Sequence, residues 1–195
     1  MQIAIALFDG VEELDFAGPW EVLAFWAQTW PDDGVGVFTV ADTTEPVRCA
    51  KGARVIPDRA WNAAEVVDVL VYPGGQGTRS QLNPEDPHHA RLRRLAERGT
   101  LMTSVCTGSL VFAAAGLLRN RPATTHWASL DTLHEIDPTI DVRDGERFVD
   151  DGQIITAAGV SAGIDMALHL VARLHSEERA RHVRRGIQYD PQPPI

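Results

Sequence analysis

A cysteine lies where a strand-like run meets a helix-like run, and its position makes it the first candidate for chemistry. Cys106 follows the apolar run Thr100–Val105 and precedes the run Gly108–Leu118. On a sharp strand-to-helix turn, a cysteine projects its sulfur from the end of a sheet, as the serine of a nucleophile elbow does. The helix N-terminus would favour the reactive thiolate. The pattern is also typical of a small, buried, unreactive cysteine, and both interpretations stay open.

A glycine turn follows another strand-like run, in Tyr72-Pro-Gly-Gly-Gln-Gly77. Gly74 and Gly75 would let backbone N–H groups approach a substrate without obstruction by side chains. One of these groups, with the N–H of Thr107, could form an oxyanion-type donor pair. The alternative is a tight turn with no chemical role. A phosphate loop is excluded, because the segment has neither a GxGxxG pattern nor a Walker lysine.

An acid follows the first strand-like run, in the segment from Asp9 to Asp15. Asp15 could cap a helix that starts at Pro19, which is a common role for aspartate. Beside the sulfur it would act differently, because two nearby anions repel each other. A thiolate at Cys106 would raise the pKa of Asp15 and make it a proton donor at neutral pH.

The best histidine for a Cys–His pair is His126, in Ala123-Thr-Thr-His-Trp127. A histidine hydrogen-bonded in a loop or core is an interpretation of equal weight, and Trp127 flanks the same segment. Five of the other six histidines are expected on helices, and the first two of them begin a surface helix: His88, His89, His169, His175 and His182. None has an HExxH context, and neither cysteine belongs to a CxxC pair, so we predict no metal.

Short apolar runs alternate with helical patterns along the chain. Such runs are typical of strands buried on both faces of a mostly parallel sheet. The predicted strands are Ile3–Phe8, Val35–Ala41, Val67–Tyr72, Thr100–Val105 and Gln153–Ala158. The main predicted helices between them are Pro19–Trp30, His88–Arg98 and Ser161–Leu174. The alternation predicts an α/β three-layer sandwich with a doubly wound sheet, in which ligands bind beyond the carboxyl ends of the strands.

Two segments break the alternation. Pro46–Pro57 predicts a hairpin that turns at Lys51-Gly52, and Val142–Ile155 predicts a second one built on Asp144-Gly145 and Asp151-Gly152. The proline-rich tail Gln188–Ile195 is expected to be extended on the surface or frayed. The length of 195 residues and the lack of a linker predict a single domain over residues 1–195.

Composition excludes some classes of protein. The net charge is −9 and the pI near 5.2, which argues against a generic nucleic-acid surface. We interpret the charge run Glu177–Arg185 as a solvated helix face. The N-terminus reads as a strand rather than a signal peptide, and no apolar run has the length of a membrane span. We therefore expect a soluble cytoplasmic protein that binds neither nucleic acid nor membrane.

Taken together, the segments resemble the DJ-1/PfpI (ThiJ) superfamily, which shares a fold with class I glutamine amidotransferases. The motifs that carry the resemblance are Phe8–Asp15, Tyr72–Gly75, Ser104–Gly108, Ala123–Trp127 and Thr156–Asp165. In this family the acidic residue that contacts the elbow cysteine is usually Glu, and here Asp15 matches that position. The protease-like members follow the cysteine with His, whereas this chain has Thr107, so peptidase chemistry is not expected. These departures, and the ending Gly186–Pro194, look like the isonitrile hydratase branch.

The resemblance implies conversion of isonitriles to N-substituted formamides by a homodimer that needs no metal or organic cofactor. Cys106 would be the nucleophile, Asp15 the acid and base, and Thr107 a helper hydroxyl. The predicted substrate-binding residues are Gly74, Gly75, Gly108, His126 and Trp127. The rival functions are a cysteine-based redox sensor, a glyoxalase-like or deglycase-like enzyme, and the sensor domain of a transcription regulator. For the last, we expect the chain to Ile195 to leave no room for a DNA-binding domain.

Overall fold

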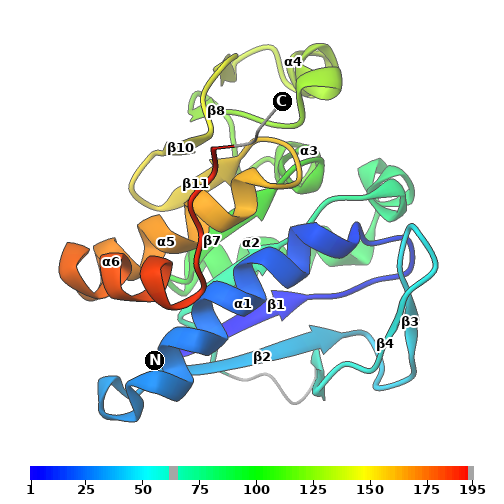
Figure 1. The fold of residues 1–195 in the computed structure, drawn as a ribbon. Coiled ribbons are helices and arrows are strands. Elements are labelled where there is room, and N and C mark those ends of the chain that lie inside the picture. Colours follow the sequence, from blue (N-terminus) through cyan, green and yellow to red (C-terminus); the bar gives the residue numbers. More distant parts are fainter. Residues whose placement is uncertain (62–65, 193–195) are drawn as a thin grey trace.

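A seven-stranded, mostly parallel sheet forms the centre of the molecule in the computed structural model, which describes residues 1–61 and 66–192 (Figure 1). The strand order is β10-β11-β7-β6-β1-β2-β5, and only β10 runs antiparallel to its neighbour. The strands are β1 (Gln2–Ala6), β2 (Gly36–Ala41), β5 (Arg59–Ala60), β6 (Val69–Tyr72), β7 (Leu101–Val105), β10 (Phe148–Asp150) and β11 (Ile154–Ala157). The five predicted strands are confirmed, as is the α/β sandwich.

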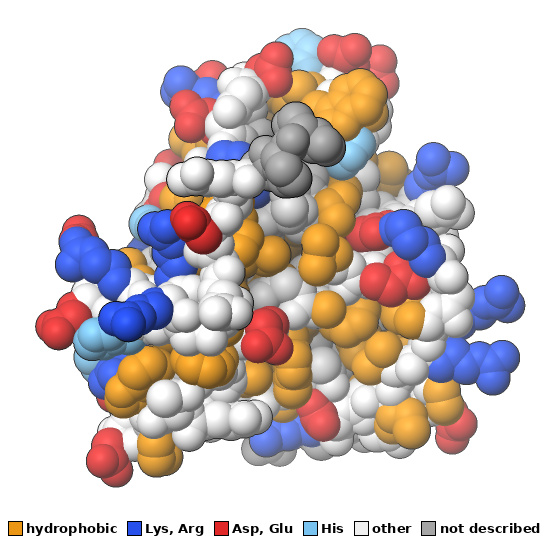
Figure 2. All heavy atoms as spheres, in the orientation of Figure 1, with side chains coloured by type: hydrophobic (Ala, Val, Ile, Leu, Met, Phe, Trp, Pro, Cys, Tyr) orange, Lys and Arg blue, Asp and Glu red, His pale blue; other side chains and the backbone are white. Residues whose placement is uncertain are grey.

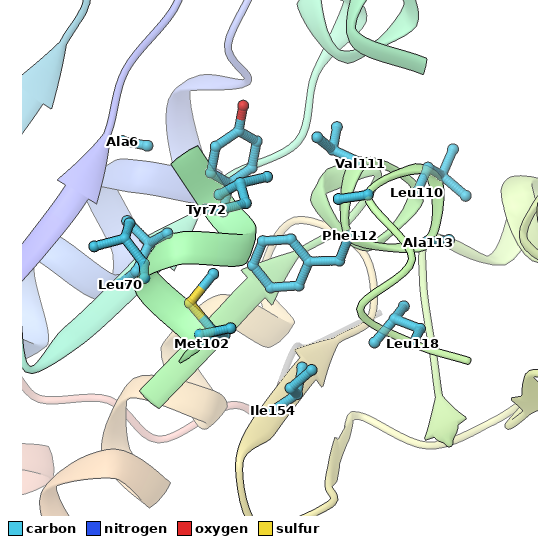
Figure 3. Packing of buried hydrophobic residues seen from close by; sticks show 14 of the residues in the cluster. Ala6, Leu70, Tyr72, Met102, Leu110, Val111, Phe112, Ala113, Leu118 and Ile154 are labelled. Carbon is cyan, nitrogen blue, oxygen red and sulfur yellow. The ribbon is translucent and has the colours of Figure 1, made fainter. Parts of the chain in front are cut away.

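Helices cover both faces of the sheet. One face packs against α1 (Glu13–Thr29), α5 (Ala162–Leu174) and α6 (Glu177–Gly186), and the other against α2 (Pro87–Glu97), α3 (Gly108–Ala114) and α4 (Leu130–Ile136). Alternate residues of a strand point to opposite faces, so Ile3 and Ile5 of β1 lie in the first core and Ala4 in the second. Figure 3 shows Leu70, Met102 and Phe112 meeting in the second core.

Short elements fill the connections. The hairpin predicted at residues 46–57 is confirmed, with β3 (Val47–Arg48) antiparallel to β4 (Arg54–Val55). The second predicted hairpin is only partly right. β10 and β11 do turn at Asp151-Gly152, but β9 (Asp141–Val142) pairs in parallel with β8 (Pro122–Ala123), so Asp144-Gly145 belongs to a loop. The remaining elements are the 3-10 helices η1 (Pro31–Asp33), η3 (Gln76–Leu82) and η4 (Trp127–Ser129).

Two details of the helices differ from the prediction. α1 begins at Glu13, so Pro19 lies inside the helix rather than at its first position, and Asp15 falls in the first turn. His89 was expected on a surface helix, but its side chain is fully buried. It lies on the inner face of α2, where its Nε2–H donates to the carbonyl of Gln81 at 2.7 Å.

The surface carries charge in several separate places. Figure 2 shows basic side chains over α6 and beside the β3–β4 hairpin, with hydrophobic side chains between them. On α6, Arg181, Arg184 and Arg185 are exposed and Val183 is buried, as expected for a solvated helix face. After α6 the tail runs alongside α5, where the Tyr189 hydroxyl donates to Asp165 at 3.0 Å. Residues 193–195 of the tail lie outside the described residues. Among the residues that the structure describes, no helix is long and apolar enough to cross a membrane.

Candidate active site

Cys106 lies on the turn between β7 and α3 in a backbone conformation that side chains rarely adopt. Its φ is 56°, in the left-handed region, which costs free energy for any residue but glycine. Three hydrogen bonds hold it there: its N–H is shared by the carbonyls of Ala157 and Ala158, at 3.1 and 2.9 Å, and its own carbonyl accepts from the Thr125 hydroxyl at 2.9 Å. The end of β11 and the segment before η4 therefore fix the sulfur's position.

The carboxyl ends of β1, β6 and β7 meet at one edge of the sheet, because the three strands are parallel neighbours (Figure 1). Gly108 allows this edge to close. A Cβ there would lie 2.3 Å from the Tyr72 carbonyl oxygen, so only glycine lets α3 start against the end of β6. A Cβ at Gly74 would similarly lie 2.6 Å from the Thr107 nitrogen and 2.9 Å from Asp15 Oδ2.

Asp15 is brought to the sulfur by contacts between the loop after β1 and the loop after β6. Val11 and Gly75 form an antiparallel bridge, and the Glu12 N–H donates to the Gly74 carbonyl at 2.9 Å. The Asp15 side chain is fully buried. Its Oδ2 accepts from the Gly74 N–H at 2.9 Å, Oδ1 has no hydrogen-bond partner among the described residues, and the Cys106 thiol lies close enough to lower the pKa of the carboxyl group. The structure thus brings together the acid and the cysteine that the sequence placed far apart.

Both groups of this pair have raised pKa values. Burial raises the pKa of Asp15 to about 7, with a further rise from the charge of Glu12, against the hydrogen bonds from Gly74 and Cys106. Burial and then the Asp15 charge raise the pKa of Cys106 to about 12, against N–H groups of Thr107 and Val160 that face the sulfur. Between about pH 7 and pH 12 the pair is therefore mainly a thiol beside a carboxylate, and near pH 7 about half of the Asp15 carboxyl groups carry a proton. The thiolate expected from the helix N-terminus is outweighed by burial.

The glycine N–H groups already have partners within the protein. Gly74 donates to Asp15, and Gly75 donates to the Thr107 hydroxyl at 3.0 Å. The Thr107 N–H faces the Cys106 sulfur. The two glycines therefore orient the Asp15 carboxylate and the Thr107 hydroxyl, while the N–H that faces the sulfur is that of the next residue, Thr107. An oxyanion role for Gly75 stays a prediction.

Thr78 is a site residue that the sequence reasoning missed. Its buried hydroxyl donates to the Gly75 carbonyl at 2.8 Å and lies 3.1 Å from the Thr107 hydroxyl. Thr78 belongs to η3, which is held by Gln81, because the Gln81 side chain accepts from the Tyr72 hydroxyl at 2.7 Å. A threonine directly after the glycine turn was the signal that could have identified it.

Val160 is the second residue that was missed. Its N–H faces the Cys106 sulfur, and its φ of 34° is an outlier for a β-branched residue. It follows β11, at the edge of the sheet where ligands bind in this class of fold. Because ligands bind beyond the carboxyl ends of the strands, the end of β11 could also have been considered, although no residue type there suggested chemistry.

His126 and Trp127 lie beside the pair rather than in it. The His126 Nδ1 accepts from the Ala128 N–H at 3.2 Å, and its ring packs so closely on Gly159 that a Cβ there would lie 2.6 Å from Cδ2. The hydrogen bonds of the described residues include none between His126 and Cys106. The Trp127 side chain is 76% exposed, with its ring centroid 5.5 Å from that of His126.

Within the described ranges, no group of three or more His, Cys, Asp or Glu side chains is arranged to hold a metal ion. What the pair itself can do follows from its protonation. A carboxylate that accepts from a thiol can remove its proton as the sulfur attacks an electrophile, and can then return that proton to the adduct. The arrangement therefore supports covalent catalysis at an electrophilic carbon.

Comparison with known proteins places this geometry in a family. Residues 1–173 match the DJ-1/PfpI family. The chain is 39% identical to the isonitrile hydratase of Pseudomonas putida over 198 residues, covering all of this chain and 81% of that protein. It is 30% identical to a glutathione-independent glyoxalase of Caenorhabditis elegans, covering 75% of this chain and 77% of that one. A crystal structure of a ThiJ/PfpI family protein from Pseudomonas syringae matches with a TM-score of 0.85, at 33% identity, over all of this chain and 77% of that chain.

Proposed function

Because this chain belongs to the DJ-1/PfpI family, we propose that it is an isonitrile hydratase, which adds water to R–N≡C and releases R–NH–CHO. The observation that carries the proposal is the proximity of the Cys106 thiol to the buried Asp15 carboxyl group, each of which shifts the pKa of the other. An isonitrile carbon must receive both a nucleophile and a proton, and this pair can supply both. The similarity to the hydratase over the whole chain supports the same reaction.

The first half of the reaction forms a thioimidate. Asp15 takes the thiol proton while Cys106 Sγ bonds to the terminal carbon, and Asp15 then delivers that proton to the same carbon. The product, R–N=CH–S–Cys106, is neutral, and the carboxylate is restored. The N–H groups of Thr107 and Val160 face the sulfur and stabilise the negative charge that develops on it during proton transfer.

The second half consumes water. Asp15 removes a proton from water while the water oxygen bonds to the thioimidate carbon, and Asp15 then delivers this proton to the nitrogen, which gives R–NH–CH(OH)–S–Cys106 and restores the carboxylate. The carbon–sulfur bond then breaks, the hydroxyl proton returns to the sulfur through Asp15, and R–NH–CHO leaves. The Thr107 hydroxyl, held by the Gly75 N–H and by Thr78, lies beside the pair and serves to position the attacking water.

The test is formamide production from cyclohexyl isocyanide by the purified protein. We expect turnover by wild type and by Cys49→Ala, which removes the other buried cysteine, and none by Cys106→Ala. An acid quench should trap an adduct of the substrate's mass on Cys106. Absence of turnover by wild type, or full turnover by Cys106→Ala, would overturn the proposal.

A second candidate is a glyoxalase-like activity, which the 30% identity to the nematode glyoxalase favours. The same thiol and carboxylate could attack the aldehyde carbon of methylglyoxal. The two functions separate in one assay series. Loss of methylglyoxal that depends on Cys106, without formamide from any isocyanide, would replace the first proposal by the second.

A further inference from the structure

A cavity of about 400 Å³ lies beside the segments that hold Cys106, and none of the catalytic steps above uses it. Its size falls within the range of small-molecule sites. It is lined by the segment before and through η4, by the β9–β10 loop and by the residues that follow β11. These residues are Thr124–Trp127, Leu130, Asp144–Arg147 and Ala158–Ser161.

The wall of this cavity is made of residues that hold the sulfur. Thr125 donates to the Cys106 carbonyl, Ala158 accepts from the Cys106 N–H, and the Val160 N–H faces Sγ. Neither Cys106 nor Asp15 lines the cavity, so Val160, which lines it and whose N–H faces Sγ, is the link between the sulfur and the cavity. A group bonded to Sγ would meet the acid at its carbon and would reach the cavity by extending past Val160.

One side of the cavity is aromatic and aliphatic. The rings of His126 and Trp127 lie with their centroids 5.5 Å apart, and the half-buried side chain of Leu130 continues the surface. Trp127 is a large apolar side chain with three quarters of its surface exposed. Burying such a ring against an apolar ligand group would remove apolar area from water.

The part of the rim that belongs to the β9–β10 loop is acidic. Asp144 and Glu146 are exposed on the β9–β10 loop, and the ion pairs among the described residues include neither of them. The one arginine of the rim, Arg147, is neutralised because its Nε donates to Asp165 at 2.8 Å. The rim therefore repels an anionic group and tolerates a neutral or cationic one.

We propose that this cavity receives the N-substituent of the isonitrile, and that it selects bulky aromatic or alicyclic substituents without negative charge. The assignment rests on the proposed function, because the substituent is placed by a carbon bonded to Cys106. Trp127 and Leu130 would contact the substituent directly. Asp144 and Glu146 would discriminate against carboxylate-bearing substrates.

The test compares kcat/KM for benzyl isocyanide, isocyanoacetate and methyl isocyanide. For Trp127→Ala we expect the benzyl-to-methyl ratio to fall about tenfold, mainly through KM, and Trp127→Phe should restore most of it. For Glu146→Gln we expect the ratio of isocyanoacetate to methyl isocyanide to rise about threefold, because a repulsive charge at the rim is removed. Glu85→Gln, an exposed glutamate outside the cavity, is the matched control and should leave that ratio unchanged.

The outcomes separate this assignment from the function on which it rests. If wild type hydrates the isocyanides but Trp127→Ala lowers kcat/KM equally for the benzyl and methyl compounds, the cavity does not hold the substituent and the hydratase proposal survives. An unchanged benzyl-to-methyl ratio has the same meaning. If wild type hydrates none of the three compounds, both proposals fall together.

Discussion

The Cys106 thiol lies beside the buried Asp15 carboxyl group, and the two groups have pKa values of about 12 and about 7. The pair therefore holds one proton and one negative charge between about pH 7 and pH 12. The charge resides on oxygen at rest, so the sulfur becomes a strong nucleophile only when Asp15 takes its proton. Activation of the sulfur and storage of the proton that the isonitrile carbon needs are thus one event.

This relationship predicts the pH dependence of hydration. The active form needs the Asp15 carboxylate and the Cys106 thiol, so kcat/KM should rise as pH increases through about 7 and level off above it. Below pH 7 the rate should fall about tenfold per unit, because protonated Asp15 cannot accept the thiol proton. Initial rates with cyclohexyl isocyanide between pH 5 and 9 check this. A profile that keeps rising up to pH 9 would instead indicate that the free thiolate is the reactive form.

The same pKa predicts a stability effect of the opposite sign. Because the folded-state pKa of Asp15 is raised above its unfolded value of 3.8, the carboxyl group favours folding below about pH 4, and this contribution is lost as pH rises toward 7. Asp15→Asn should therefore stabilise the protein at pH 8, by about 1–2 kcal/mol, while it abolishes hydration. Urea unfolding of both proteins at pH 8 and at pH 4 measures this difference in the free energy of unfolding, which should vanish at pH 4. Equal effects at the two pH values would contradict the raised pKa.

The pairing of acid and cysteine was predictable from the sequence, because apolar runs identify parallel strands and the ends of parallel strands meet at one edge. Boundaries and single contacts were harder. Pro19 resembles a first helical residue, yet α1 starts at Glu13. His89 resembles a surface residue, although it faces the core. The role of Thr78 depends on a hydroxyl contact between two loops, and the role of Val160 depends on a backbone angle. The residue types threonine and valine do not predict either role.

Thr78 should be a positioning residue that acts through Thr107. Thr78→Val removes the hydroxyl 3.1 Å from that of Thr107, and we expect kcat to fall about three- to tenfold with KM little changed. The matched control is Thr100→Val, which also deletes one buried hydroxyl, bonded to the Val67 carbonyl at 2.7 Å, at the far end of β7. Both variants should lose similar stability in thermal unfolding, but only the first should lose kcat. Equal kcat values for Thr78→Val and Thr100→Val would mean that Thr78 has only a structural role.

The last prediction concerns the strained backbone at Val160. Its φ of 34° costs a β-branched residue about 1–3 kcal/mol, and glycine adopts such a conformation freely. Val160→Gly keeps the N–H that faces the sulfur, so we expect Tm to rise by a few degrees and the Cys106-dependent reaction to continue, with kcat/KM altered only for bulky isocyanides. Ile56→Gly, at an exposed β-branched residue without positive φ, is the control and should lower Tm slightly. A lower Tm for Val160→Gly than for Ile56→Gly would mean that packing of the valine side chain outweighs the strain.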